Sequence, residues 1–290
     1  MAKDVLKLAI IGGADAYHAV AFSTLFNTGP RRSQFAGRAD VPDLSSRARV
    51  VSVWDEVREP AEKLAREHEI GRVAASIAEA VDGVDGALLI DDHMDQHRWA
   101  PAMIEAGVPY FHDKPLAPTY ARAQEIVQMA KAKGALMFSS SSIRHARELL
   151  AELPALRDEG GPKFAVGFVP RGEIMYYGIH ALEPVLSVMG VRTKEMKYAR
   201  SGSAHLVSLS WEDGREALFV MDDRIKHIAL NFYTEKQAHV IQTTDEWAYY
   251  GNQMAAFLDM METKRIPVPW EETLEVIRLL DVAQKAAGQG

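Results

Sequence analysis

A lysine between an aspartate and a proline is the residue of this sequence best suited to proton and charge transfer. Asp113, Lys114 and Pro115 follow residues 110–112, a short run typical of a buried strand. Ligands of open α/β sheets bind at the carboxyl ends of the strands. A lysine there can stabilise an alkoxide or donate a proton, because burial readily lowers the pKa of its ammonium group. Pro115 can give a rigid turn, in cis geometry, that fixes the approach of the lysine.

A second candidate is the turn at residues 12–17, which follows the apolar run 6–11. The dinucleotide fingerprint G-x-G-x-x-G would place glycines where this chain has Gly12, Ala14 and Tyr17. Those glycines allow a tight turn, close approach of the backbone to pyrophosphate, and close packing of helix on strand. Ala14 adds only one methyl group, whereas Tyr17 predicts a displaced first helix. The turn indicates a dinucleotide site or, with equal weight, an ordinary strand–helix connection.

Asp55 lies at the end of the second strand-like run, residues 48–54. An acidic residue there commonly accepts hydrogen bonds from the adenosine ribose. Its separation from Gly12 exceeds the usual ~20 residues, and an insertion at residues 27–47 accounts for the excess. We expect Asp55 to favour NAD over NADP because its carboxylate would repel a 2′-phosphate, with nearby Arg58 offsetting part of that repulsion. The alternative is that Asp55 is only an acid at a helix N-terminus.

A third candidate is the stretch 91–97, in which five side chains are able to bind a metal: Asp91, Asp92, His93, Asp95 and His97. The stretch follows the apolar run 86–90 and begins a helix, where acidic residues favour the helix dipole in any case. No cysteine is present to complete a metal site. We therefore expect no metal here and favour a cofactor or substrate loop, with simple helix capping as the alternative.

Two patterns of apolar residues organise the chain around these candidates. Up to about residue 150, short apolar runs alternate with helix-like stretches, which indicates βαβ units and a parallel sheet. From residue 164 to residue 243, strand-like runs follow at short intervals, with a hairpin signal at Asp213-Gly214, which indicates an antiparallel sheet. The long segment 27–47 indicates a surface insertion, with a mobile flap or a partner contact as the alternatives.

Four features in order along essentially the whole chain carry a resemblance to a known family: GGADAYH (12–18), Asp55, EAGVPYFHDKPLA (105–117) and YYGIHALEPVLSVMG (176–190). They resemble the Gfo/Idh/MocA family (glucose–fructose oxidoreductase, inositol dehydrogenase and rhizopine catabolism). The segment 105–117 is the most specific, because it is similar to the family motif A-G-x-x-V-x-x-E-K-P. The resemblance implies an α/β fold with an N-terminal Rossmann domain, placed at residues 1–122. It further implies a C-terminal α/β domain on an open, mostly antiparallel sheet, placed at residues 123–290.

The resemblance also assigns roles to residues. The family lysine corresponds to Lys114, and the family glutamate before it is the shorter Asp113 here. The family motif D-x-G-x-H, which begins a helix lining the substrate pocket, corresponds to residues 176–180, so that the histidine is His180 and the aspartate is replaced by Tyr176. A histidine base needs a partner that orients it and stabilises the imidazolium. Tyr176 could instead bind the substrate or take part in proton transfer.

The resemblance therefore implies an NAD(P)-dependent oxidoreductase that transfers hydride between nicotinamide and a hydroxyl or keto carbon of a sugar, cyclitol or related polyhydroxylated molecule. The hydroxyl would lie between Lys114, which stabilises the oxyanion, and His180, which takes the proton. One alternative is a non-catalytic nicotinamide or ligand sensor on the same fold, which the lost glycines, Asp113 and Tyr176 favour. The other is an epimerase or eliminase that uses nicotinamide as an internal redox shuttle.

The expected site has three sets of residues. The catalytic set is Lys114, His180 and Tyr176. The cofactor set comes from the turns after the first strands: Gly12, Gly13, Ala14, Asp15, Ala16, Asp55, Arg58, Asp91, Asp92, His93, His97, Asp113, Lys114 and Pro115. The substrate set is Lys114, Arg144, Tyr176, Tyr177 and His180. Serines 139–142 either bind a polyol or form a polar loop, and four histidines without an evident partner are interpreted as structural: His68, His205, His227 and His239.

Composition limits the remaining possibilities. The chain has 290 residues, a formal net charge of −7 and no cysteine. These values argue against nucleic acid as the main partner and exclude disulfides and thiolate chemistry. No stretch approaches the ~20 apolar residues of a membrane helix, and the first residues lack the pattern of a cleavable signal. We expect a cytoplasmic protein with no metal and no membrane partner, which forms a homo-oligomer, a dimer or a tetramer, as the resemblance suggests.

Overall fold

The computed structural model describes residues 5–27, 38 and 41–288. Its contacts divide the chain into two units. Unit 1 comprises Met1–Ala117, Gln124–Ser139 and Tyr250–Pro269, and unit 2 comprises Pro118–Ala123, Ser140–Tyr249 and Trp270–Gly290. The insertion expected at residues 27–47 lies largely outside the described residues.

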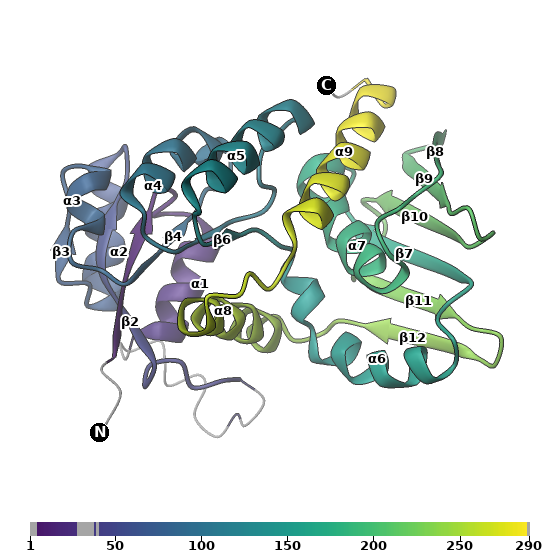
Figure 1. The fold of residues 1–290 in the computed structure, drawn as a ribbon, viewed down its shortest axis with the longest axis horizontal. Helices are drawn as coiled ribbons and strands as arrows, with labels where there is room; N and C mark the ends of the chain where they lie inside the picture. The colour runs from purple at the N-terminus through teal and green to yellow at the C-terminus, as the bar shows by residue number, and fades with distance from the viewer. Residues whose placement is uncertain (1–4, 28–37, 39–40, 289–290) are drawn as a thin grey trace. The chain divides into compact units, whose positions relative to one another are not determined.

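Unit 1 is built on a six-stranded parallel sheet in the order β3-β2-β1-β4-β5-β6 (Figure 1). Its strands are β1 (Leu6–Ile11), β2 (Ala48–Trp54), β3 (Arg72–Val73), β4 (Gly86–Leu89), β5 (Tyr110–His112) and β6 (Met137–Phe138). Residues 8–11 of β1 have no exposed surface, as expected for a strand buried on both faces. The two halves of the sheet start from β1 and β4, which is the doubly wound Rossmann order. The parallel sheet expected from the alternating pattern is confirmed.

The helices of unit 1 come from both ends of the chain: α1 (Tyr17–Phe26), α2 (Arg58–His68), α3 (Ile77–Val81), α4 (Ala100–Ala106), most of α5 (Tyr120–Lys133) and most of α8 (Glu246–Thr263). Local signals define several ends. The Oγ of Ser76 accepts a hydrogen bond from Glu79 N at the start of α3, and α4 ends at Gly107 with φ +68°. Helix α8 lies beside α1 (Figure 1), where Tyr250 packs against Phe22 with ring centroids 5.8 Å apart. The C-terminal part of the chain thus completes the core of the first sheet.

Unit 2 is built on a second six-stranded sheet, in the order β12-β11-β7-β10-β9-β8. Its strands are β7 (Phe164–Pro170), β8 (Glu195–Ser201), β9 (Ala204–Ser210), β10 (Glu216–Asp222), β11 (Ala229–Tyr233) and β12 (Ala238–Gln242). Strands β7 and β10 pair in parallel, and the other neighbours are antiparallel. The expected open, mostly antiparallel sheet is therefore confirmed.

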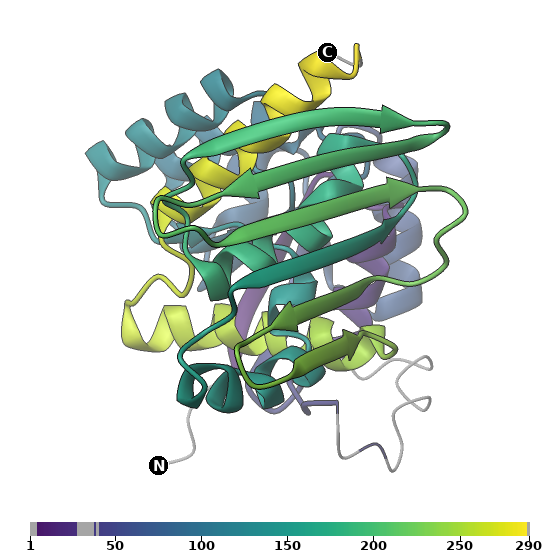
Figure 2. The ribbon, with the colours of Figure 1, turned by 90° about the vertical axis from the view of Figure 1, so that its right-hand side faces the viewer.

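One face of the second sheet carries the helices of unit 2, which are α6 (Arg147–Asp158), α7 (Ile174–Met189) and α9 (Trp270–Ala286). Helix α7 approaches the sheet closely, because a Cβ on Gly167 of β7 would lie 2.8 Å from the Cβ of Ala181. Figure 2 shows the opposite face, across which no helix of the described chain passes. No helix of the described residues is both long enough and apolar enough to span a membrane.

Candidate active site

The turn after β1 has a conformation that favours glycine. Gly12 and Gly13 have φ angles of +74° and +48°, in the left-handed region that side chains rarely adopt. A Cβ on Gly13 would lie 2.8 Å from the carbonyl oxygen of Ile90. The backbone N–H of Gly12 donates to the carbonyl oxygen of Trp54, at the end of β2, at 2.8 Å. Both glycines are therefore required by the turn that joins β1 to α1.

Two carboxylates hold the backbone N–H groups of this turn. Ala14 N donates to Asp55 Oδ2 at 2.7 Å, and Tyr17 N donates to Asp92 Oδ2 at 3.0 Å. The other oxygen of Asp55 accepts from Val57 N at 2.8 Å. In dinucleotide-binding folds, N–H groups at this helix N-terminus face the pyrophosphate. In this chain, its own carboxylates occupy two of those donors.

A cavity of about 310 Å³ lies over the turn. Its lining combines expected residues with others that the sequence did not single out: Gly13, Asp15, Asp55, Glu56, Val57, Pro60, Asp91, His93, Asp95 and Trp99. Arg58 instead hydrogen-bonds Glu62, Nε to Oε1, at 2.8 Å. The glycine turn lies where dinucleotide-binding folds hold the pyrophosphate, and Asp55 lines the cavity beside that turn. The acidic lining makes this a site of strong negative potential for the phosphates of any such ligand.

The acidic stretch after β4 folds into a capped turn. Asp91 Oδ2 accepts from Asp95 N at 2.6 Å, at the start of a 3₁₀ helix over Asp95–Arg98. Burial raises the pKa of Asp91. His97 Nδ1 lies 2.7 Å from the carbonyl oxygen of Met94. In the described part of the chain, no three histidine, aspartate or glutamate side chains are grouped to hold a metal ion.

Lys114 is buried at the carboxyl end of β5. The residue is 3% exposed, and burial lowers the pKa of its ammonium group, against the opposing charges of Asp113 and Asp92. The peptide bond between Lys114 and Pro115 is cis, as the sequence suggested. The position therefore favours the neutral amine more than water does, which suits a group that exchanges protons.

The residues around Lys114 are held by a buried hydrogen-bonded chain. Asp113 Oδ2 lies 2.6 Å from His18 Nδ1, and His18 Nε2 lies 3.2 Å from Tyr250 Oη. The amide of Gln96 donates to the carbonyl oxygens of the residues before and after Lys114, at 3.2 and 2.9 Å. The sequence analysis missed His18, Gln96 and Tyr250. His18 lies in the turn GGADAYH and Gln96 lies in the stretch 91–97, so both were inside segments that the sequence singled out.

In unit 2, helix α7 presents the second set of expected residues. His180 is 9% exposed, and its Nδ1 lies 2.8 Å from Ser141 Oγ. The ring of Tyr177, one turn earlier, has its centroid 6.1 Å from that of His180 and 5.1 Å from that of Tyr176. The guanidinium carbon of Arg171 lies 4.9 Å from the Tyr177 centroid. Tyr177 therefore lies beside this histidine, and Tyr176 and Arg171 pack against Tyr177.

A buried glutamate that the sequence analysis missed lies one turn after His180. Glu183 is 2% exposed, and its Oε2 accepts from Ser141 N at 2.6 Å. Arg144 bonds Glu272 at 2.7 Å, and its Nη1 lies 3.9 Å from the other oxygen of Glu183. Burial raises the pKa of Glu183 to about 7, against the charge of Arg144 and the Ser141 hydrogen bond. In unit 2, Ser141 thus links Glu183 to the expected His180, and the expected Arg144 lies near the other oxygen of Glu183.

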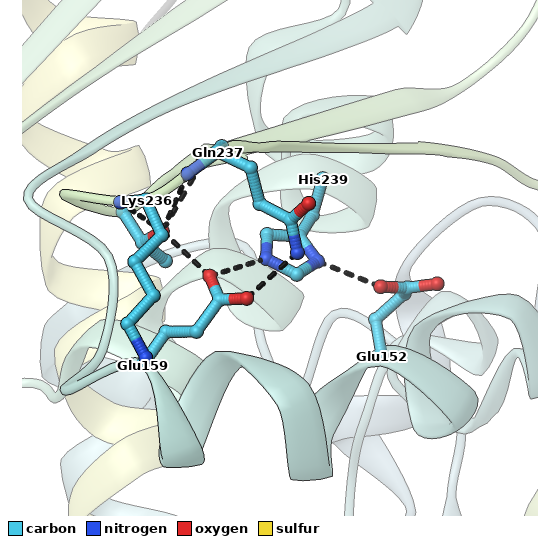
Figure 3. A network of polar contacts seen from close by, with 6 residues as sticks. Glu152, Glu159, Lys236, Gln237 and His239 are labelled. Atoms are coloured by element: carbon cyan, nitrogen blue, oxygen red, sulfur yellow. Dashed lines mark hydrogen bonds and ion pairs between the residues drawn. The ribbon is translucent and has the colours of Figure 1, made fainter.

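Two of the histidines interpreted as structural have partners, contrary to the sequence-based expectation. His239 lies between Glu152 of α6 and Glu159 at the C-cap of that helix, with Nδ1 2.7 Å from Glu152 Oε2 and Nε2 3.0 Å from Glu159 Oε2 (Figure 3). His205 Nδ1 lies 2.8 Å from Tyr198 Oη. Their partners are distant in sequence or on a neighbouring strand, so local spacing did not show them. The histidines nevertheless lie in regular elements of unit 2 and tie those elements together.

Comparisons with solved structures show the same fold over the whole length. GenD2 from gentamicin A biosynthesis, solved with NAD, has a TM-score of 0.82 and 13% identity, and the match covers 100% of this chain and 96% of that one. The myo-inositol dehydrogenase of Lactobacillus casei, solved with NAD(H) and myo-inositol, has a TM-score of 0.77 and 16% identity, with 99% and 96% covered. Biliverdin reductase of Synechocystis sp. PCC 6803, solved with biliverdin and NADP⁺, has a TM-score of 0.70 and 16% identity, with 98% and 99% covered. At these identities the likeness establishes the fold.

Family comparison is more specific for unit 1. A search of curated proteins gave no match. Residues 7–141 match the oxidoreductase family with an NAD-binding Rossmann fold, GFO_IDH_MocA. That range spans β1 to β6 and includes the glycine turn, Asp55 and Lys114. These residues, and with them the candidate cofactor site, belong to the Gfo/Idh/MocA oxidoreductase family.

Proposed function

We propose that this chain is an NAD(P)-dependent oxidoreductase that transfers hydride between nicotinamide and a hydroxyl or keto carbon of a sugar, a cyclitol or a related polyhydroxylated molecule. The observation that carries the proposal is the buried Lys114 at the carboxyl end of β5. Its ammonium form stabilises a developing oxyanion, and burial eases its exchange of protons. The fold shared with enzymes solved with NAD or with myo-inositol supports the substrate class.

The roles follow from the chemistry of each side chain. Lys114 stabilises the oxyanion, and His180 accepts the proton of the substrate hydroxyl. Tyr176 contributes its phenol to substrate binding or to proton transfer, while Arg144 and Tyr177 bind other substrate oxygens. In the direction of reduction, His180 returns the proton.

Bound NAD(P) would accept the hydride from the reacting carbon. We propose that the turn at residues 12–16, Asp55 and the stretch 91–97 hold it. NAD is favoured over NADP, because Asp55 and Glu56 both line the cavity and would repel a 2′-phosphate. Arg58 offers limited compensation, since its side chain is 63% exposed and bonded to Glu62.

We also propose a cytoplasmic homo-oligomer, a dimer or a tetramer, in which the open face of the second sheet is the contact. Phe164 and Tyr233 are paired in register on neighbouring strands and are 36% and 37% exposed. Val240 on β12 is 71% exposed. Large apolar side chains gathered on an open face indicate an interaction surface. The proposed substrate is a small molecule, with no role for nucleic acid or a membrane.

The proposal is tested by calorimetric titration with NAD and with NADP, followed by absorbance at 340 nm with a panel of polyols, aldoses and cyclitols. We expect NAD to bind roughly 10–100-fold more tightly than NADP, and at least one compound to reduce it. Tight binding of NAD without turnover on any compound would point to a sensor. Failure to bind either cofactor would overturn the proposal.

A further inference from the structure

A histidine that acts as a base needs a partner on its second ring nitrogen. The partner decides which nitrogen carries the proton of the neutral ring. The position one turn before His180, where a carboxylate could serve, is Tyr176. In the structure, the partner of His180 Nδ1 is a serine from another part of unit 2: Ser141 Oγ lies 2.8 Å from that nitrogen.

Ser141 is fixed on several sides. It is fully buried, and its Oγ accepts a hydrogen bond from Ile143 N at 3.2 Å. Its own backbone N–H donates to Glu183 Oε2 at 2.6 Å. Glu183 and His180 are three residues apart on α7, so they lie on one face of that helix. The helix therefore holds both the imidazole and, through Glu183, the backbone that carries its partner.

The donor in the contact between Ser141 and His180 follows from the chemistry that a base requires. A serine oxygen has two lone pairs and one proton. Ile143 N–H uses one lone pair, and the second can accept Nδ1–H of His180. Nε2 then carries no proton and can take one from a substrate. The resulting imidazolium keeps the same hydrogen bond, so the site needs no rearrangement during the step.

We propose that Ser141 is the positioning residue of His180: its Oγ accepts a hydrogen bond from Nδ1–H and leaves Nε2 as the unprotonated nitrogen, in the role that a carboxylate at position 176 would have. The catalytic meaning of this contact rests on the proposed function. The distance between Ser141 Oγ and His180 Nδ1 does not, and the tautomer of His180 can be measured whether or not the protein turns over a substrate.

The tautomer is measured by two-bond ¹H–¹⁵N correlation NMR on protein labelled with ¹⁵N-histidine, at a pH where the ring is neutral. The signals of His180 are assigned from their absence in His180→Gln. We expect the Nδ1–H form in the parent and in Ser141→Thr, and a shift toward the Nε2–H form in Ser141→Ala. An Nε2–H form in the parent, or no change in Ser141→Ala, would overturn the proposal.

The chain provides a matched control in the adjacent serine. Ser140 is also buried, and its Oγ lies 3.1 Å from Nε2 of a different histidine, His145. Ser140→Ala should leave the His180 signals unchanged. Thermal unfolding of each variant shows that the alanine substitutions preserve the fold.

Kinetics then separate the inference from the function on which it rests. On an active substrate, Ser141→Ala should lower kcat roughly 10–100-fold with little change in KM. Ser141→Thr should recover most of the rate. If His180→Gln keeps full turnover, the proposed base is wrong, while the NMR result still decides the contact. If His180→Gln is inactive and Ser141→Ala is fully active, the positioning role fails and the base stands.

Discussion

Burial and hydrogen bonding move pKa values in opposite directions in two regions of this molecule. Around His239, contacts favour charged forms: Glu159 and Glu152 raise the pKa of the imidazole, and His239 and Thr234 lower the pKa of Glu159 to about 2 (Figure 3). At Glu183 in unit 2 and at Lys114 in unit 1, burial favours the neutral forms, since it raises the pKa of Glu183 to about 7 and lowers the pKa of Lys114. The first region holds its charges in place. At the buried groups, the charged form is less favourable than it is in water.

The difference separates two kinds of polar cluster that look alike in a sequence. His239 is 5% exposed, and both of its ring nitrogens face carboxylates, so its protonated form is fully matched. Glu183 has one oxygen matched by a backbone N–H and the other only near a guanidinium at 3.9 Å. The His239 cluster balances its own charges and connects α6 to β12. The Glu183 cluster leaves one carboxylate oxygen without a close partner charge, which makes it the better candidate for proton transfer.

The largest expected effect is the loss of turnover on replacing Lys114, whose pKa is shifted by burial. Lys114→Ala should lower kcat by ~10²–10³, about 3–4 kcal/mol, because one preorganised donor to the oxyanion is lost. The effect on cofactor affinity should be smaller. Lys114→Arg should rescue poorly, since a guanidinium does not release its proton. Steady-state kinetics on one active substrate measures both.

A variant that keeps more than about a tenth of the parental kcat would remove Lys114 from the chemistry, since a donor of this kind is worth ~10² or more. Circular dichroism serves as the control for folding. Lys133→Ala is the matched surface variant, because Lys133 is 53% exposed and bonds Glu105; we expect its kcat to be unchanged.

Glu183 should make the protein less stable as the pH rises. Its pKa in the folded state lies above the unfolded value, so the folded state holds the proton longer and unfolding becomes easier between pH 4.5 and about 7. The shift corresponds to about 3 kcal/mol of unfolding free energy when complete. Glu183→Gln should remove this loss, as measured by urea unfolding at pH 4.5, 6 and 8.

The comparison is made between parent and variant at each pH. His112 and His145 are buried with pKa values lowered to about 3, and they destabilise both proteins equally as the pH falls. The difference therefore isolates Glu183. Glu173→Gln, at an exposed position beside the start of α7, should change the profile by less than about 0.5 kcal/mol. Parallel profiles for Glu183→Gln and the parent would show that Glu183 is ionised throughout.

His239 belongs to the charge-matched region, and its loss should be felt most at low pH. His239→Ala removes two hydrogen bonds to carboxylates, with an expected cost of about 2 kcal/mol at pH 6. The stabilisation is complete below the unfolded histidine value and is lost as the pH rises through the raised pKa of His239. Thermal unfolding at pH 6 and pH 9 should therefore show a smaller cost at pH 9.

His227→Ala is the control for that series, because His227 is exposed and belongs to the same unit. Its effect should stay within about 0.5 kcal/mol at either pH. A cost for His239→Ala that is equal at both pH values would mean that the imidazole is uncharged between its two glutamates.

The smallest expected effect concerns the carboxylates over the glycine turn. Asp92→Asn keeps an acceptor for Tyr17 N but removes a negative charge from the place that phosphates would approach. NAD should bind up to about tenfold more tightly, which corresponds to ~1.4 kcal/mol. Calorimetry measures the change, with Asp85→Asn as the control, because Asp85 caps Lys7 N at the opposite end of the strands. Weaker binding in Asp92→Asn would show that this carboxylate contacts the cofactor directly.

Local sequence patterns predicted the fold well, because buried strands appear as short apolar runs and helix ends as glycines. The run of residues 6–11 predicted β1, Gly107 predicted the end of α4, and the closely spaced runs after residue 164 predicted the second sheet. Each of these signals is complete within a few residues of chain. The family match then confirmed the Rossmann domain.

The partners within the candidate site could not be predicted, because they lie far apart in the sequence. Ser141 meets His180 across 39 residues, and His18 meets Asp113 across 95. The same limit made His239 look isolated, although Glu152 lies 87 residues away and within 2.7 Å. No spacing rule connects such pairs before the elements that carry them are packed.

The last segment of unit 1, Tyr250–Pro269, is synthesised long after the strands that it covers, and this order affects folding. Tyr250 closes the chain through His18 to Asp113, and Phe257 and Met261 pack against Gly86 of β4. A growing polypeptide has therefore made all six strands of the first sheet long before it makes the helix that covers part of it. That part of the apolar surface of the Rossmann unit therefore stays uncovered until α8 (Glu246–Thr263) has been synthesised.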